Sequence, residues 1–148
     1  MPIDKVLWPG KPATDEQIAE FEKIEGVKLP ADYRAFLMTY NGGRPIPDCF
    51  PFGTEPGSLL DTFFELGEGE GKTNDLQTMC DQYRPRIPHT MMPIGCDAGG
   101  NAILLGVHGE PWGRVFFLDY MNPRPIFEIA PSFEAFLASF EPRPEVGD

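Results

Sequence analysis

The stretch IAEFEKIEGVKLPADYRAFLMTYNGG, residues 18–43, carries the strongest periodic signal in the chain. Large apolar residues recur in it at the i, i+3, i+4 and i+7 spacing of one helix face: Tyr33, Phe36, Leu37 and Tyr40. A helix beginning at Pro30 or Ala31 is therefore expected. Asn41, Gly42 and Gly43 follow it, and these residue types favour the left-handed backbone that ends a helix.

A second helix is predicted just before this one. Residues 14–17 read TDEQ, a capping-box pattern that satisfies the free amides at a helix start. Ile18, Phe21 and Ile24 then form an apolar stripe, and Gly26 ends the segment. The two helices should pack side by side against a common core.

The rest of the chain alternates turns with short strands and two more helices. Residues 44–57 are rich in proline and glycine, which favours turns with one short edge strand. A middle helix is expected over residues 74–83, capped by Asn74, and a last helix after Ser132 with Phe133, Phe136, Leu137 and Phe140 inward. Strands are predicted at residues 61–66, 91–95, 102–107, 114–120 and 126–129.

Two helices, a run of hairpin-connected strands and a closing helix predict an α+β fold. The sheet should be mostly antiparallel, with about five to six strands, flanked by the N-terminal helix pair, the middle helix and the C-terminal helix. The 148 residues are expected to form one domain, with a core over about 14–140 and a frayed tail at 141–148.

Composition limits the classes of function. The net charge of −11 disfavours binding to nucleic acid or to an anionic membrane, and it favours basic partners. No apolar run approaches the roughly 20 residues needed to span a bilayer. Three widely spaced cysteines and no evident secretory signal favour a reduced, cytoplasmic setting.

The charge is concentrated in the middle of the chain. Between Asp48 and Asp75 seven acidic residues face a single base, Lys72, which gives this segment a net charge of −6. Aromatic residues are interleaved with the acids. Of the adjacent pair Phe63 and Phe64, at least one should belong to the core, because they point to opposite sides of the predicted strand.

Within this segment, ELGEGEGKTNDLQ (residues 65–77) resembles a phosphate-binding loop at first sight. A P-loop requires a glycine followed by four spacer residues before Gly-Lys-Ser/Thr. Leu66 stands where that glycine is needed, and Glu68 and Glu70 would repel phosphate oxygens. The segment is interpreted as an acidic loop, and no nucleotide cofactor is expected.

Metal and catalytic sites have little support in the sequence. The cysteines form no CxxC pair, and His89 and His108 lack the short spacings of zinc ligands. Nucleophilic catalysis would need a Ser or Cys beside a histidine, and nothing in the sequence supports such a pairing. No metal, no cofactor and no catalytic residue is predicted, although paired carboxylates for acid–base work stay open.

The segment PIGCDAGGNAILL, residues 93–105, predicts a strand, a tight turn and a second strand. Asp97 can accept hydrogen bonds from turn amides, while the glycines and Asn101 tolerate positive φ. A ligand contact by the exposed turn backbone is the weaker alternative. The residues assigned to structural turns are Gly42, Gly43, Asp97, Gly99, Gly100 and Asn101.

Taken in order, these segments resemble the SUKH superfamily, which includes the fungal Smi/Knr cell-wall regulators and many bacterial toxin-immunity proteins. The resemblance is carried by residues 18–43, by PIGCDAGGNAILL, by GRVFFLDY (113–120) and by PSFEAFLASF (131–140), and it runs from about residue 14 to 140. Two departures are Phe116-Phe117-Leu118, in a strand where the aromatic of the family is frequently Trp, and Tyr120, near Asp119, where the family often has a histidine.

This resemblance implies a non-catalytic domain that binds a protein, most simply an immunity protein neutralising a basic toxin such as a nuclease. A regulatory or scaffolding domain acting on a housekeeping protein is the alternative, and a small-ligand-binding protein or enzyme is a third. Aromatics would anchor the interface and acids would steer the partner from its rim. The predicted partner-binding residues are Asp48, Phe50, Phe52, Glu55, Asp61, Glu65, Glu68, Glu70 and Asp75.

Overall fold

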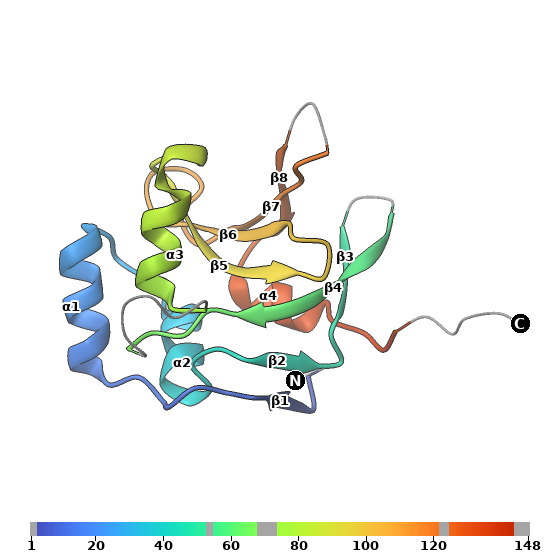
Figure 1. Ribbon diagram of the computed structural model, residues 1–148, viewed down its shortest axis with the longest axis horizontal. Helices are drawn as coiled ribbons and strands as arrows, with labels where there is room; N and C mark the ends of the chain where they lie inside the picture. The colour runs from blue at the N-terminus through green and yellow to red at the C-terminus, as the bar shows by residue number, and fades with distance from the viewer. Residues whose placement is uncertain (1–2, 53–54, 68–73, 122–124, 144–148) are drawn as a thin grey trace, which may run out of the picture.

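The structure is a computed structural model that describes residues 3–52, 55–67, 74–121 and 125–143 (Figure 1). Its helices are α1 (Asp15–Glu25), α2 (Ala31–Thr39), α3 (Leu76–Tyr83), a short 3-10 turn η1 (Arg84–Arg86) and α4 (Phe133–Ala138). Its strands are β1 (Lys5–Leu7), β2 (Arg44–Ile46), β3 (Cys49–Phe52), β4 (Glu55–Phe63), β5 (Met91–Asp97), β6 (Ala102–Gly106), β7 (Val115–Leu118) and β8 (Ile126–Ala130).

The predicted α+β class is confirmed. Strands β3 to β8 form one antiparallel six-stranded sheet in sequence order, so each strand pairs with the next along the chain. A separate two-stranded sheet, β1–β2, was not expected from the sequence. In the view of Figure 1, α1 and α3 lie at one end of the molecule, and β3 and residues 141–143 lie at the other.

Local capping explains where the first two helices begin and end. The Thr14 hydroxyl accepts from the Gln17 amide, and the Gln17 side chain accepts from the Thr14 amide, which completes the predicted capping box. Gly26 closes α1 with φ of 67°, and Asn41 follows α2 with φ of 50°. Both helix boundaries agree with the sequence prediction.

Two helix details differ from the prediction. Helix α3 is capped by Asp75, whose carboxylate accepts from the Thr78 amide at 2.9 Å, rather than by Asn74. Ile24 was expected to face inward, but its exposed fraction is 60%. At about 100° per residue, Ile24 lies about 120° around α1 from Ile18, outside the face that Ile18 and Phe21 bury.

The core lies on both sides of the sheet. On β6, Ile103 and Leu105 contribute to the larger cluster, whereas Leu104 faces a smaller cluster that includes Tyr83 of α3. Both Phe63 and Phe64 are buried. A cluster of aromatic side chains joins α2, α4 and β4. The rings of Phe36, Phe63 and Phe133 pack edge to face, with their centroids 5.0 to 5.7 Å apart.

The residues after α4 run back along the sheet edge. The Glu141 amide donates to the Cys49 carbonyl oxygen at 2.8 Å, and Arg143 forms two hydrogen bonds to Asp48. Residues 141–143, which the sequence assigns to a frayed tail, therefore contact β3, and residues 144–148 of that tail lie outside the described chain. Among the described residues, no helix is long and apolar enough to cross a bilayer.

Candidate partner-binding surface

Three of the predicted partner-binding residues are buried and have structural contacts. Asp48 is 3% exposed, and both of its carboxylate oxygens accept from Arg143, at 3.1 and 2.8 Å. Phe50 is fully buried, with its ring centroid 5.3 Å from that of Phe136. Asp75 is 3% exposed and caps α3. In this arrangement none of the three side chains presents its polar or aromatic end to solvent.

Two other members of the set lie nearer the surface. Asp61 is exposed and forms an ion pair with Arg44 at 2.6 Å. Glu65 is half-buried, and its side chain packs so closely over Gly42 that a Cβ there would come within 2.6 Å of it. Glu68 and Glu70 lie outside the described residues, as do the side chains of Phe52 and Glu55, whose backbones belong to β3 and β4.

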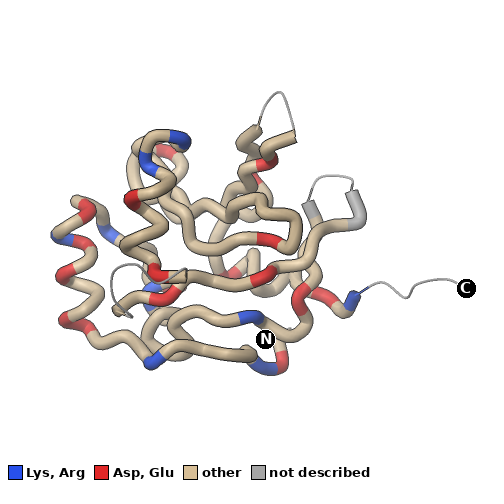
Figure 2. Tube along the Cα trace, in the orientation of Figure 1, with Lys and Arg blue, Asp and Glu red and all other residues tan. Residues whose placement is uncertain are grey.

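A different acidic surface lies on the outer face of α1. Glu16, Glu20 and Ile24 are exposed and spaced i, i+4 and i+8, which places them in one stripe along the helix. Figure 2 shows acidic positions along α1 and further acidic positions on the neighbouring segment that leads into α3. We call Glu16, Glu20 and Ile24 the outer stripe.

The outer stripe forms one wall of an open groove of about 560 Å³ between α1 and the start of α3. Phe21 and Leu66 contribute apolar side chains to it. The remaining lining residues are mostly polar, and the full set is Glu16, Gln17, Glu20, Phe21, Ile24, Leu66, Gly67, Asp75 and Gln77. The groove thus combines an apolar floor with carboxylates along one edge.

The acidic residues on another side of α1, unlike those of the outer stripe, form ion pairs with α2. Arg34 pairs with Asp15 at 3.2 Å and with Glu22 at 3.3 Å. By contrast, Glu16 and Glu20 have no ion pair or side-chain hydrogen bond within the described chain. The stripe therefore presents two negative charges that the fold itself does not neutralise.

Sequence reasoning missed this stripe although a signal was present. Once Ile18 and Phe21 define the inward face of α1, the i, i+4, i+8 spacing places Glu16, Glu20 and Ile24 on the outside. Assigning Ile24 to the inward stripe concealed that pattern.

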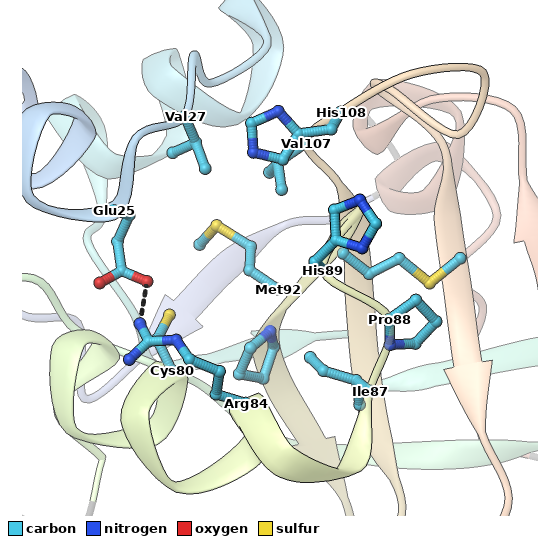
Figure 3. A pocket seen from close by; sticks show the side chains of 12 residues that line it. Glu25, Val27, Cys80, Arg84, Ile87, Pro88, His89, Met92, Val107 and His108 are labelled. Atoms are coloured by element: carbon cyan, nitrogen blue, oxygen red, sulfur yellow. Dashed lines mark hydrogen bonds and ion pairs between the residues drawn. The ribbon is translucent and has the colours of Figure 1, made fainter.

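A second cleft brings together both histidines of the chain (Figure 3). It has a volume of about 270 Å³ and lies where the end of α1, α3 and the β5 and β6 ends meet, with His89 and His108 on its walls and Met92 on its floor. Glu25 closes one side by accepting from Arg84 at 2.8 Å, and its other carboxylate oxygen accepts from Gln77 at 2.6 Å.

The cysteine that lines this cleft is disfavoured as a nucleophile. Cys80 lies beneath Arg84, and burial raises the pKa of its thiol far above the usual value, with the Glu25 carboxylate adding to the shift. Burial and then the neighbouring Asp61 raise the pKa of Cys96, outside the cleft, to about 11. The described residues contain no group of three or more His, Cys, Asp or Glu side chains that could hold a metal ion.

The turn at residues 97–101 has the contacts of a structural turn. Asp97 is buried, and its Oδ1 accepts from the amides of Gly99 at 3.0 Å and Asn101 at 2.7 Å. Its Oδ2 accepts from the Ser58 hydroxyl at 2.7 Å, which ties the turn to β4. Positive φ occurs at Gly100 and not at Asn101. The carboxylate is thus occupied by backbone and side-chain donors of the fold.

Gly42 and Gly43 occupy the other predicted structural turn, after α2. They have φ values of 105° and 91°, and backbone or side-chain atoms lie within 2.6 Å of the place a Cβ would take at each. Both close approach and positive φ therefore require glycine there.

Two comparisons with known proteins show what this chain is similar to. The model of the SMI1 / KNR4 family (SUKH-1) matches residues 12–139. The SPbeta prophage-derived uncharacterized protein YokK of Bacillus subtilis (strain 168) is 32% identical over 156 aligned residues, which cover 91% of this chain and 78% of that protein.

Proposed function

Because the chain belongs to the SMI1/KNR4 family (SUKH-1), we propose that it is a non-catalytic protein-binding domain, namely an immunity protein that neutralises a basic toxin domain. The observation that carries the proposal is the pair of uncompensated carboxylates, Glu16 and Glu20, beside an open groove. A net charge of −11 adds a long-range field of the same sign.

The electrostatics suit rapid capture of a cationic protein. Toxin domains that act on nucleic acid carry basic surfaces, and complementary charge raises the association rate by steering the encounter. We propose that the predicted residues Asp61, Glu65, Glu68 and Glu70 act at the rim of the contact with the partner. Asp48, Phe50 and Asp75 are buried and have structural contacts, so in this proposal they do not touch the partner directly.

The bacterial toxin-linked role is favoured over the regulatory one by the relative. The similar Bacillus subtilis protein is described as prophage-derived, which places it on a mobile element and not among fungal regulators. A regulatory or scaffolding domain that acts on a housekeeping protein would share the fold but would not need a toxin gene beside its own.

The experiment is a protection assay with a salt titration. Toxin domains encoded beside the gene are expressed with and without this protein, and growth is measured. We expect rescue, and we expect the association rate of the purified pair to fall about tenfold or more between 50 and 500 mM salt.

The charge-reversal variant Glu65→Lys/Glu68→Lys/Glu70→Lys should associate more slowly and with a weaker salt dependence. If the wild-type protein does not rescue growth but binds a housekeeping protein stably, the immunity role is wrong and the regulatory role is favoured. A thermal shift specific to one nucleotide, sugar or metal would point to the small-ligand alternative.

A further inference from the structure

The spacing of the outer stripe fits one kind of partner element. From Glu16 to Ile24 the stripe runs along about 12 Å of α1, at 1.5 Å per residue, and neighbouring members are about 6 Å apart along the axis. A partner helix that carries basic residues four positions apart presents its charges at the same interval. Stripe and partner can therefore match in register.

The two carboxylates are placed where the isolated helix gains little from them. Like charges at i and i+4 destabilise a helix, and the helix dipole favours only Glu16, which lies in the first turn. Glu20 lies in the middle of α1 and its charge has no compensating partner in the described chain. A Lys or Arg side chain of a partner beside Glu20 would offset the repulsion between Glu16 and Glu20.

The apolar part of the groove supplies the second half of the match. Ile24 is 60% exposed at the end of the stripe, and Phe21 and Leu66 line the groove beside it. Covering Ile24 with an apolar side chain would remove this surface from water. Because the acids lie at one end of the stripe and the apolar side chain at the other, a partner helix can match both in one orientation along α1 only.

We propose that the groove lined by α1 and by Leu66, Gly67, Asp75 and Gln77 is the docking site for a basic amphipathic helix of the partner. That helix carries Lys or Arg at two positions four residues apart, opposite Glu16 and Glu20, and an aliphatic or aromatic residue one turn further along, opposite Ile24. The choice of occupant rests on charge complementarity and on the proposed function as a protein-binding domain.

The test uses a synthetic helical peptide of about 18 residues, with Lys at i and i+4 and Leu at i+8, and alanine elsewhere on that face. Its affinity for the full-length protein is measured by fluorescence anisotropy at low salt, and its site is mapped from backbone amide chemical shifts. We expect shifts centred on α1 and on Leu66, Gly67, Asp75 and Gln77. We expect the variant Glu16→Lys/Glu20→Lys to bind at least tenfold more weakly.

The charge-matched control is Asp4→Lys/Glu141→Lys, which also has a net charge of −7 but changes exposed acids near β1 and β3, far from α1. It should bind the peptide within about threefold of wild type. Equal losses in the two double variants would overturn the proposal, because they would show that only net charge matters. Shifts centred on any other surface would overturn it as well.

The apolar contact is tested by a double-mutant cycle. Ile24→Ser should weaken binding about tenfold, and replacing the peptide Leu by Ser should then have little further effect, because the two side chains contact each other. Additive losses would contradict the predicted register. Circular dichroism confirms that the Ile24→Ser protein is folded, which its exposed position favours.

The same variants separate this inference from the proposed function. If Glu16→Lys/Glu20→Lys still protects cells from a toxin that the wild type neutralises, the docking site is wrong while the immunity role stands. If the wild type neutralises no toxin but binds the peptide at α1, the site stands and the immunity role fails.

Discussion

The two acidic regions of this molecule use their charges differently. In the segment from Asp48 to Asp75, which has the largest formal excess in the sequence, Asp48 pairs with Arg143 and Asp75 caps a helix. On the outer face of α1, Glu16 and Glu20 pair with nothing in the described chain. Counting the acidic residues in a stretch of sequence therefore overestimates the negative charge that a partner can contact, because some of the carboxylates cap helices or form ion pairs within the fold.

The largest expected effect concerns the aromatic residues of the first region. Phe50→Ala should lower the free energy of unfolding by about 3–5 kcal/mol, because it removes a fully buried ring from contact with Phe136 and Phe140. Urea denaturation measures this loss. The control is Ile24→Ala on α1, which should change stability by less than about 0.5 kcal/mol. A Phe50→Ala protein of wild-type stability would place Phe50 at the surface and restore it as an anchor.

A smaller effect distinguishes capping from free charge at the end of the same region. Asp75→Ala should cost about 1 kcal/mol, since the Thr78 amide loses its acceptor at the start of α3. Asn74→Ala, the neighbouring position that the sequence favours as the cap, should cost clearly less. Chemical denaturation of the two variants side by side decides the matter, and the reverse order would mean that Asn74 is the cap.

The sequence predicts those parts of the fold that depend on neighbours along the chain. The capping box at Thr14, the Gly26 cap and the strands around Asp97 all follow from residues within a few positions of one another. The sheet order was within reach because hairpins connect consecutive strands. The pairing of β1 with β2 could not be predicted in this way, since almost forty residues separate Leu7 from Arg44.

The site was less predictable because it depends on distant pairs. Arg143 lies 95 residues from Asp48, and no local pattern shows that this carboxylate is buried beneath it. His89 and His108 are isolated in the sequence yet line one cleft, because β5 and β6 bring their ends together. The helix α1 was predicted correctly, but Ile24 was assigned to its buried side, whereas its side chain is exposed.

The smallest expected effect is also the most direct test of the contrast between the two regions. Glu20→Lys should raise the free energy of unfolding by about 0.2–0.5 kcal/mol, because a repulsive i, i+4 pair with Glu16 becomes an attractive one. Asp15→Lys, in the first turn of the same helix, should lower it, since Asp15 pairs with Arg34 and favours the helix dipole. Differential scanning calorimetry of both variants against wild type gives the signs. A gain in stability with a loss of partner binding would show that Glu20 is retained for recognition. A loss of stability would instead reveal an intramolecular partner for Glu20, and the outer stripe would then resemble the Asp48–Asp75 segment.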